Sequence, residues 1–355
     1  MTTPASTPSV PYAAGRWSDE QIDAWYGKQP WLVGANFIPS DAANQLTMWQ
    51  AETFNPDLID KELGWAAGLG MNTMRVFLHD LLWQQDAEGF LRRIDQYLAI
   101  STKHGISTML VLFDSVWRPE PKLGVQPEPV PGVHNSQWVQ NPGYALADPT
   151  QEPRLEAYVK GVVGRFANDP RVVVWDIWNE PSNLNAGRFT ELPNKQELVK
   201  ALLPKAFAWA RSAKPTQPLT AGVWIGDKFL DDPLAETQLA LSDIISFHSY
   251  DAPDKFLSRV AEFAAGRPLL CTEYMARKQA STFEAILPLA KERKVGMYNW
   301  GFVAGKSQTF MPWDSWQNPY ITAEPDPWFH DIFREDGQAY REDEVAFLRK
   351  VLSKA

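Results

Sequence analysis

Short apolar segments alternate with longer amphipathic segments along most of the chain. The apolar segments predict eight strands, at 31–38, 72–78, 106–114, 172–178, 219–224, 243–249, 268–274 and 295–302. Several of them are almost continuously apolar, as in ISTMLVLFD at 106–114. Parallel strands that are covered on both faces have this pattern, whereas half-exposed strands alternate.

The amphipathic segments between the strands predict helices. Their ranges are 57–69, 90–104, 153–167, 195–213, 254–265, 282–293 and 342–353, with a weaker candidate at 233–241. Asn55 and Pro56 form a cap and a first-turn proline at the start of the first helix. Gly70 and Gly105 lie where left-handed C-terminal caps are expected. Pro204 should break or kink the fourth helix, because proline removes a backbone donor.

Eight strand–helix repeats in 355 residues predict an α/β fold of the (β/α)₈ TIM-barrel type. We expect a flexible tail at 1–15, rich in Pro, Ser and Thr, and a single catalytic domain at 16–355. A doubly wound sheet is the alternative, but no glycine-rich phosphate-binding motif follows the first strand. The two longest irregular segments, 115–150 and 303–340, both follow strands. They therefore belong to the C-terminal rim, where barrel active sites lie.

Composition limits the partners of the chain. A net charge of −9 argues against general binding to nucleic acid or to anionic membranes, and no segment has the roughly 18 apolar residues of a membrane span. The N-terminus lacks the charged region and the apolar region that a signal peptide has, which favours a cytoplasmic location. If a signal peptide was removed beforehand, the protein would be periplasmic or secreted. The single cysteine, Cys271, is expected to be a buried thiol. The sequence leaves the oligomeric state open.

Polar residues stand at the ends of several predicted strands, where their neighbours are strongly apolar. They are Arg75, Asp114, Asn179, Glu180, His248, Tyr250, Glu273 and Trp300. Two carboxylates that face one cavity are the groups needed to cleave a glycosidic bond, one as acid and the other as nucleophile. A lone glutamate could instead form a structural ion pair with Arg75. That reading does not account for Glu180 and Glu273 together with the other polar strand ends.

The histidines outside these strand ends carry less information. For His79 and Asp80 a structural role and a functional role are equally well supported, while His104 and His330 are expected to be ordinary packing or surface residues. The five histidines show no paired ligand spacing, so no metal and no other cofactor is expected.

The set of strand-end residues resembles the clan A glycoside hydrolases, and within them family 5, the cellulase-like family. The resemblance covers roughly residues 30–303 and rests on Arg75, Trp-Asn-Glu-Pro at 178–181, His-x-Tyr at 248–250, Thr-Glu at 272–273 and Trp300. It implies a retaining double displacement with Glu180 as acid/base and Glu273 as nucleophile. The two carboxyl groups should then lie about 5–5.5 Å apart, compared with roughly 6.5–9.5 Å in inverting enzymes.

The resemblance also implies roles for the remaining residues. Asn179 would contact the sugar 2-hydroxyl, Tyr250 and Arg75 would orient Glu273, and Trp300 would form the floor of the subsite. Many relatives carry a histidine at the end of strand three, where this chain has Asp114. We therefore expect Asp114 to take over a substrate contact.

The sequence favours an exo-acting β-glycosidase, such as a β-mannosidase or β-glucosidase, with a β-linked oligosaccharide as its partner. The segments 115–150 and 303–340 should wall off one end of the groove, and Trp117 gives the first segment an apolar surface for the rim or for a sugar. An endo-acting cellulase, mannanase or xylanase is the alternative, with both segments merely capping the barrel. A transglycosylase and, from a different class, a non-catalytic carbohydrate-binding barrel also remain open.

Overall fold

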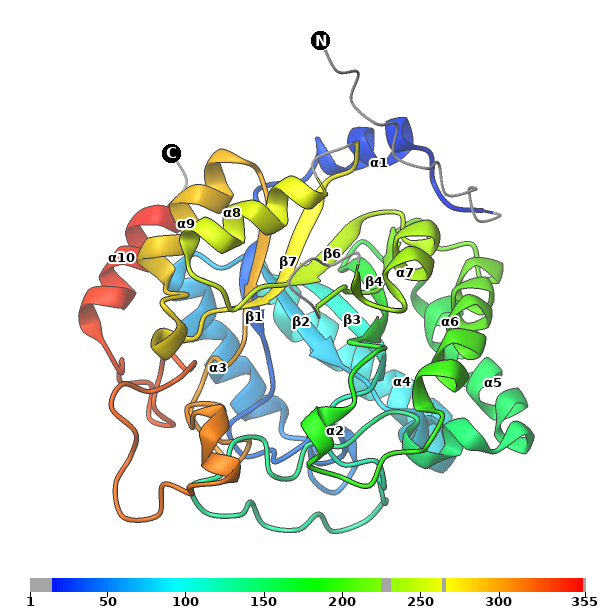
Figure 1. Ribbon diagram of the computed structural model, residues 1–355, viewed down its shortest axis with the longest axis horizontal. Helices are drawn as coiled ribbons and strands as arrows, with labels where there is room; N and C mark the ends of the chain where they lie inside the picture. The colour runs from blue at the N-terminus through cyan, green and yellow to red at the C-terminus, as the bar shows by residue number, and fades with distance from the viewer. Residues whose placement is uncertain (1–14, 225–230, 264–265, 354–355) are drawn as a thin grey trace.

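The computed structural model describes residues 15–224, 231–263 and 266–353. The predicted tail at 1–15 lies outside these residues except for Gly15. The described strands are β1 (Val33–Asn36), β2 (Thr73–Phe77), β3 (Ser107–Asp114), β4 (Val172–Asn179), β5 (Leu219–Thr220), β6 (Ile245–His248), β7 (Leu269–Tyr274) and β8 (Gly296–Asn299). Figure 1 shows them at the centre of the molecule, surrounded by helices.

The strands form one parallel sheet that closes into a barrel. Their order is β5-β4-β3-β2-β1-β8-β7-β6, so β1 pairs with β8 and the open edges belong to β5 and β6. Val223 closes this gap by a parallel bridge to Phe247: its N–H donates to the carbonyl of Ser246, and its carbonyl accepts from His248 N–H. The prediction of a (β/α)₈ barrel is therefore confirmed.

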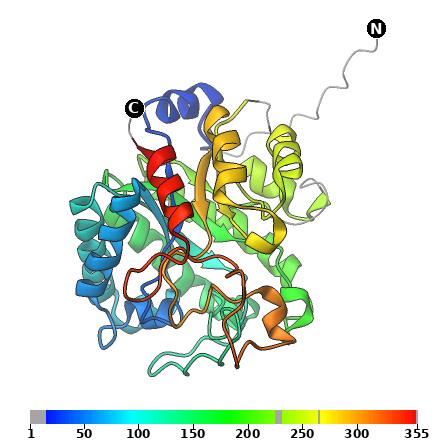
Figure 2. The same ribbon diagram turned by 90° about the vertical axis from the view of Figure 1, so that its left-hand side faces the viewer.

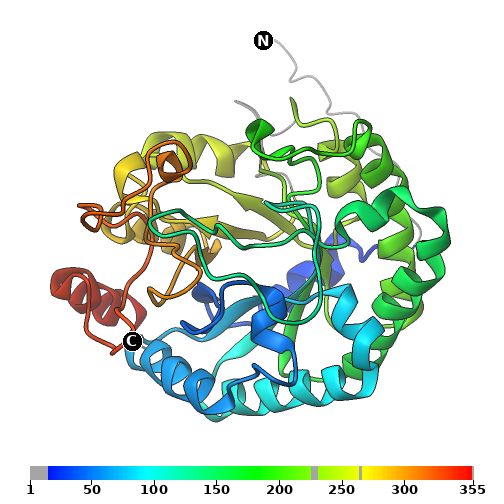
Figure 3. The same cartoon turned by 90° about the horizontal axis from the view of Figure 1, so that it is seen from below.

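Helices surround the sheet, as the view along the barrel in Figure 3 shows. The α-helices are α1 (Asp19–Tyr26), α2 (Gln45–Trp49), α3 (Pro56–Leu69), α4 (Asp80–Lys103), α5 (Glu152–Phe166), α6 (Lys195–Ser212), α7 (Ala235–Leu241), α8 (Pro253–Glu262), α9 (Phe283–Glu292) and α10 (Glu342–Leu352). Short 3₁₀ helices are η1 (Gly143–Ala147), η2 (Pro149–Gln151), η3 (Asn185–Gly187), η5 (Arg277–Gln279) and η6 (Trp313–Trp316). Within the described residues, no helix has the length and apolarity to cross a membrane.

Local sequence signals mark both ends of α3. The Asn55 side chain accepts from Leu58 N–H, and Gly70 ends the same helix with φ 89°, as predicted. α6 continues through Pro204, so the helix is not broken there. The helix predicted at 90–104 lies in the part of α4 that follows a kink at the non-helical residue Asp86, and the turn from Asp80 to this kink was not predicted.

The two ends of the barrel are closed differently. At the N-terminal end, Ile22 of α1 packs with a group of inward-facing apolar side chains that includes Leu32, Val173 and Leu270. The segments 115–150 and 303–340 both lie at the opposite end, as Figures 1 and 2 show. This is the C-terminal rim that the sequence predicted for them.

Candidate active site

Arg75 of β2 is fully buried inside the barrel and connects several strand-end residues. Its Nε and Nη2 donate to Asp176 Oδ2 at 3.0 and 2.8 Å. Nη1 donates to Asn36 Oδ1 at 2.7 Å and to Glu273 Oε1 at 3.1 Å, and Nη2 also donates to Asn179 Oδ1 at 2.6 Å. The rigid guanidinium therefore fixes the positions of carboxylates and amides from three other strands, β1, β4 and β7.

Glu273 lies on β7, and both of its carboxylate oxygens have defined partners. Oε1 accepts from Arg75, while Oε2 accepts from the Tyr250 hydroxyl at 2.7 Å. His248 Nδ1 also lies 3.5 Å from Oε2. Because these groups favour a negative charge, Glu273 is the carboxylate of the site best suited to remain ionised.

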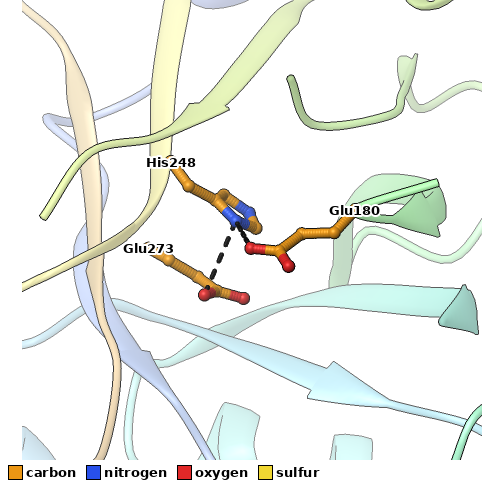
Figure 4. Close-up of side chains that lie close together, drawn as sticks. All are labelled: Glu180, His248 and Glu273. Atoms are coloured by element: carbon orange, nitrogen blue, oxygen red, sulfur yellow. Dashed lines mark hydrogen bonds and ion pairs between the residues drawn. The ribbon is translucent and has the colours of Figure 1, made fainter. Parts of the chain in front are cut away.

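Glu180 directly follows β4 and is held by a different set of groups. Its Oε1 lies 2.7 Å from His248 Nδ1, and its Oε2 accepts from Asn183 Nδ2 at 2.6 Å. Figure 4 shows the His248 ring between the two glutamates, with interactions to both. Glu180 has a left-handed backbone with φ 45°, which is unusual for a residue with a side chain and is common at functional sites.

Burial dominates the electrostatics of the three groups. It raises the pKa of Glu180 to about 7, while Asn183 and Arg75 act in the opposite direction. Burial also raises the pKa of Glu273, as does the neighbouring Glu180, while His248, Arg75 and Tyr250 act in the opposite direction. The pKa of His248 falls to about 4 because its cation is desolvated, so the ring is neutral near pH 7. Because Arg75 and Tyr250 donate to Glu273, Glu180 is the carboxyl group better placed to retain a proton.

The two carboxyl groups lie close together. One oxygen of Glu180, one oxygen of Glu273 and one ring nitrogen of His248 lie within 4.8 Å of one another. This upper limit on one oxygen–oxygen distance is compatible with the carboxyl spacing of about 5–5.5 Å in retaining enzymes, and that spacing stays a prediction. The three groups could also hold a metal ion by type and spacing, so independence from metals stays a prediction.

The position of Asp114 does not fit the prediction that this residue contacts the substrate. It is buried behind Asn179: its Oδ1 accepts from Asn179 Nδ2 at 2.9 Å, and its Oδ2 accepts from Trp138 Nε1 at 2.7 Å. Burial raises the pKa of Asp114 to about 6. The carboxylate is occupied by protein donors, so it holds the Asn179 amide in place instead of facing the cavity.

A cavity of about 260 Å³ opens above the two glutamates. Its lining includes the predicted residues Glu180, Glu273, Asn179, Tyr250, Trp117 and Trp300, and also Val116, His134, Asn183, Asn185, Ala186, Arg188, Trp224 and Trp313. The lining does not include three of the predicted residues, Arg75, Asp114 and His248. Each of them contacts a residue that does line the cavity: Glu273, Asn179 and Glu180, respectively. The volume is close to the lower end of small-molecule sites, which is roughly 300 Å³.

Aromatic side chains from three loops meet beside the cavity. The Trp117 ring stacks on Trp316 with centroids 5.1 Å apart and an angle of 19°. Trp316 in turn contacts Phe189 edge to face at 5.4 Å. We call Trp117, Phe189 and Trp316 the aromatic wall. It joins the segment after β3, the loop after β4 and the segment after β8.

Sequence reasoning missed the loop residues and the residues behind the site. Asn183 follows Glu180 by three positions, and this spacing was the available signal. Asn36 and Asp176 face the barrel interior on predicted strands, so a count of inward polar positions would have found them. His79 and Asp80 have a structural role, because they pair with each other at 3.1 Å and Asp80 also binds Arg154.

The cellulase model of glycosyl hydrolase family 5 matches residues 43–318 of this chain. The chain belongs to this family. It is therefore a member of a retaining family of glycoside hydrolases, as the strand-end residues predicted. A curated relative, mannan endo-1,4-β-mannosidase A of Emericella nidulans, is 29% identical over 91 residues, which cover 26% of this chain and 22% of that protein.

Solved structures share the barrel at low sequence identity. An exo-β-1,4-mannosidase from Opitutaceae bacterium strain TAV5 has a TM-score of 0.59 and 18% identity, over 91% of this chain and 60% of that chain. A Streptomyces cattleya enzyme in complex with Manβ1-4GlcNAc has a TM-score of 0.57 and 12% identity, over 90% and 80%. A β-mannanase from Mytilus edulis has a TM-score of 0.53 and 15% identity, over 81% and 89%. These similarities support the fold.

Proposed function

We propose that this chain is an exo-acting retaining β-glycosidase that removes terminal sugars, of the manno or gluco series, from short β-linked oligosaccharides. The observation that carries the proposal is the pair Glu180 and Glu273, which face one small cavity with unlike partners. A carboxyl group with pKa near 7 suits a general acid, and a carboxylate bound by Arg75 suits a nucleophile.

In the first step, Glu273 Oε attacks the anomeric carbon while Glu180 gives its proton to the leaving glycosidic oxygen. The products are a covalent glycosyl-enzyme and a free leaving sugar. In the second step, Glu180 takes a proton from water, and the resulting hydroxide displaces Glu273 from the sugar. Tyr250 and Arg75 hold Glu273, and Asn179 keeps one amide hydrogen for the sugar, because Asp114 occupies the other.

Exo action is supported by the aromatic wall and by the size of the cavity. The Trp117–Trp316 stack joins two rim segments beside the site, and we infer that it would block a polymer in that direction. The exo-β-1,4-mannosidase and the enzyme with bound Manβ1-4GlcNAc among the structural relatives agree with a short substrate.

The test is product analysis with aryl β-glycosides, short oligosaccharides and a soluble β-mannan and β-glucan. We expect monosaccharide release with retained configuration and a slow fall in polymer viscosity. A rapid fall in viscosity with products of mixed length would instead establish endo action. The mannanase relatives make an endo-β-mannanase the second candidate.

A further inference from the structure

Within the described residues, Arg188 lines the catalytic cavity and has no carboxylate partner. It lies on the loop after β4, and its buried Nε has no acceptor among those residues. The only described hydrogen bond of its side chain is a long one, 3.4 Å from Nη1 to the carbonyl of Asn185. Burial lowers the pKa of Arg188. The terminal nitrogens of this cation are therefore the donors that a ligand can use.

The loop that carries Arg188 is tied to the proposed acid. Asn183 donates to Glu180 Oε2 and accepts from Asn185 N–H, while Asn185 Oδ1 accepts from Trp117 N–H at 2.7 Å. Asn185, Ala186 and Gly187 all have left-handed φ, of 55, 49 and 73°, so the chain turns sharply just before Arg188. Glu180 protonates the departing oxygen in the proposed function. Arg188 and Glu180 line one cavity, so Arg188 would face a sugar of the substrate that is held there.

Among the described residues, the carboxyl groups that line the cavity interact with groups other than Arg188. Glu180 contacts His248 and Asn183, and Glu273 pairs with Arg75, which Asp176 shares. His134 is neutral because burial lowers its pKa to about 4. A planar guanidinium binds carboxylate or phosphate through two parallel hydrogen bonds.

We propose that Arg188 recognises an anionic group, a carboxylate or a phosphate, on a sugar of the substrate in the catalytic cavity. The inference rests on the proposed function for the nature of the substrate. It adds that the preferred substrate carries a uronic acid or a sugar phosphate instead of neutral hexoses alone.

A purely structural role for Arg188 is the competing explanation, because its guanidinium lies 5.5 Å from the Trp117 ring. Arg118 provides a matched control. It also has no described carboxylate partner and lies 5.7 Å from the Phe189 ring of the same aromatic wall. Arg118 lines a different cavity, away from Glu180. If packing on the wall were all that mattered, both arginines would behave alike.

The experiment measures binding by calorimetry in a Glu180→Gln background, which keeps the disaccharides intact. The ligands are β-1,4-mannobiose and cellobiose, each also prepared with a C6 carboxylate or a 6-phosphate on either the reducing-end or the non-reducing-end sugar. We expect at least one anionic ligand to bind about tenfold or more tightly than its neutral parent, since hydrogen bonds between charged groups are the stronger ones. The preference should weaken at high salt.

Adding Arg188→Met should abolish the preference, Arg188→Lys should retain part of it, and Arg118→Met should leave it intact. Thermal melting of each variant checks that the fold is kept. Equal binding of neutral and anionic ligands, or an unchanged preference in Arg188→Met, would overturn the inference. Failure of the unmodified enzyme to cleave any glycoside would refute the proposed function instead, because the binding comparison does not require turnover.

Discussion

Replacing Glu180 by Gln should stabilise the protein at alkaline pH and leave its stability at acidic pH almost unchanged. Glu180 is buried, and its pKa of about 7 lies well above the ordinary value of 4.5. Glutamine resembles the protonated form of this side chain. The substitution therefore removes the cost of ionising a buried carboxyl group and keeps its shape.

The sign and size follow from linkage between protonation and folding. The folded state binds the Glu180 proton more tightly than the unfolded state does. The contribution of this proton to the free energy of unfolding is therefore fully present below pH 4.5 and is lost as the pH rises through 7. A pKa difference of this size corresponds to about 3 kcal/mol. The free energy of unfolding of Glu180→Gln minus that of the wild type should therefore rise by about 3 kcal/mol between pH 4 and pH 8.

Urea unfolding at pH 4, 6 and 8 measures this difference directly. Glu62→Gln is the control, because Glu62 of α3 is also buried with a pKa raised to about 7 but accepts from Ser40 N–H outside the cavity. Both variants should show the same dependence of stability on pH, and only Glu180→Gln should lose activity. A constant difference across the three pH values would refute the reasoning about burial.

Four other outcomes test the site. Added azide should partly restore the activity of Glu180→Ala on aryl glycosides and yield a β-glycosyl azide. Glu273→Ala should be inactive on every substrate. NMR detects the azide product of the first variant and the absence of product from the second. Asn183→Ala removes a donor that favours the ionised form of Glu180. The basic limb of the kcat/KM–pH profile should therefore move up from about 7 by roughly one pH unit. In a control variant with a substitution elsewhere on the rim, this limb should not move. Asp114→Asn should lower kcat/KM about tenfold, because an amide cannot accept from both Asn179 and Trp138 as the carboxylate does. Activity should persist in chelator, and a loss restored by one divalent ion would assign a metal to the Glu180–His248–Glu273 cluster.

The strand ends were predictable because barrel topology brings them to one rim. Glu180 and Glu273 are 93 positions apart, yet both directly end or follow parallel strands, and the carboxyl ends of such strands meet. The same reasoning assigned Tyr250 and Trp300 correctly to the cavity. The succession of short apolar and longer amphipathic segments predicts which strands exist, and this is sufficient to predict the positions at their ends.

The contacts made by loop residues, and the burial of residues behind those that line the cavity, were not predictable in this way. Asp114 ends β3 like the other polar residues, but Trp138 and Gln45 donate to it from distant segments and so occupy its oxygens. The position of Arg188 depends on successive left-handed residues in a loop without a periodic pattern. Nothing local in the sequence specifies such long-range contacts.

The stacking of Trp117 on Trp316 makes two distant parts of the chain dependent on each other during evolution. An insertion or deletion in 115–150 that displaces Trp117 leaves Trp316 with one face uncovered, and the reverse also holds. Length changes in these two segments should therefore be inherited in pairs among the descendants of this protein. The barrel strands would meanwhile accumulate substitutions independently of both segments.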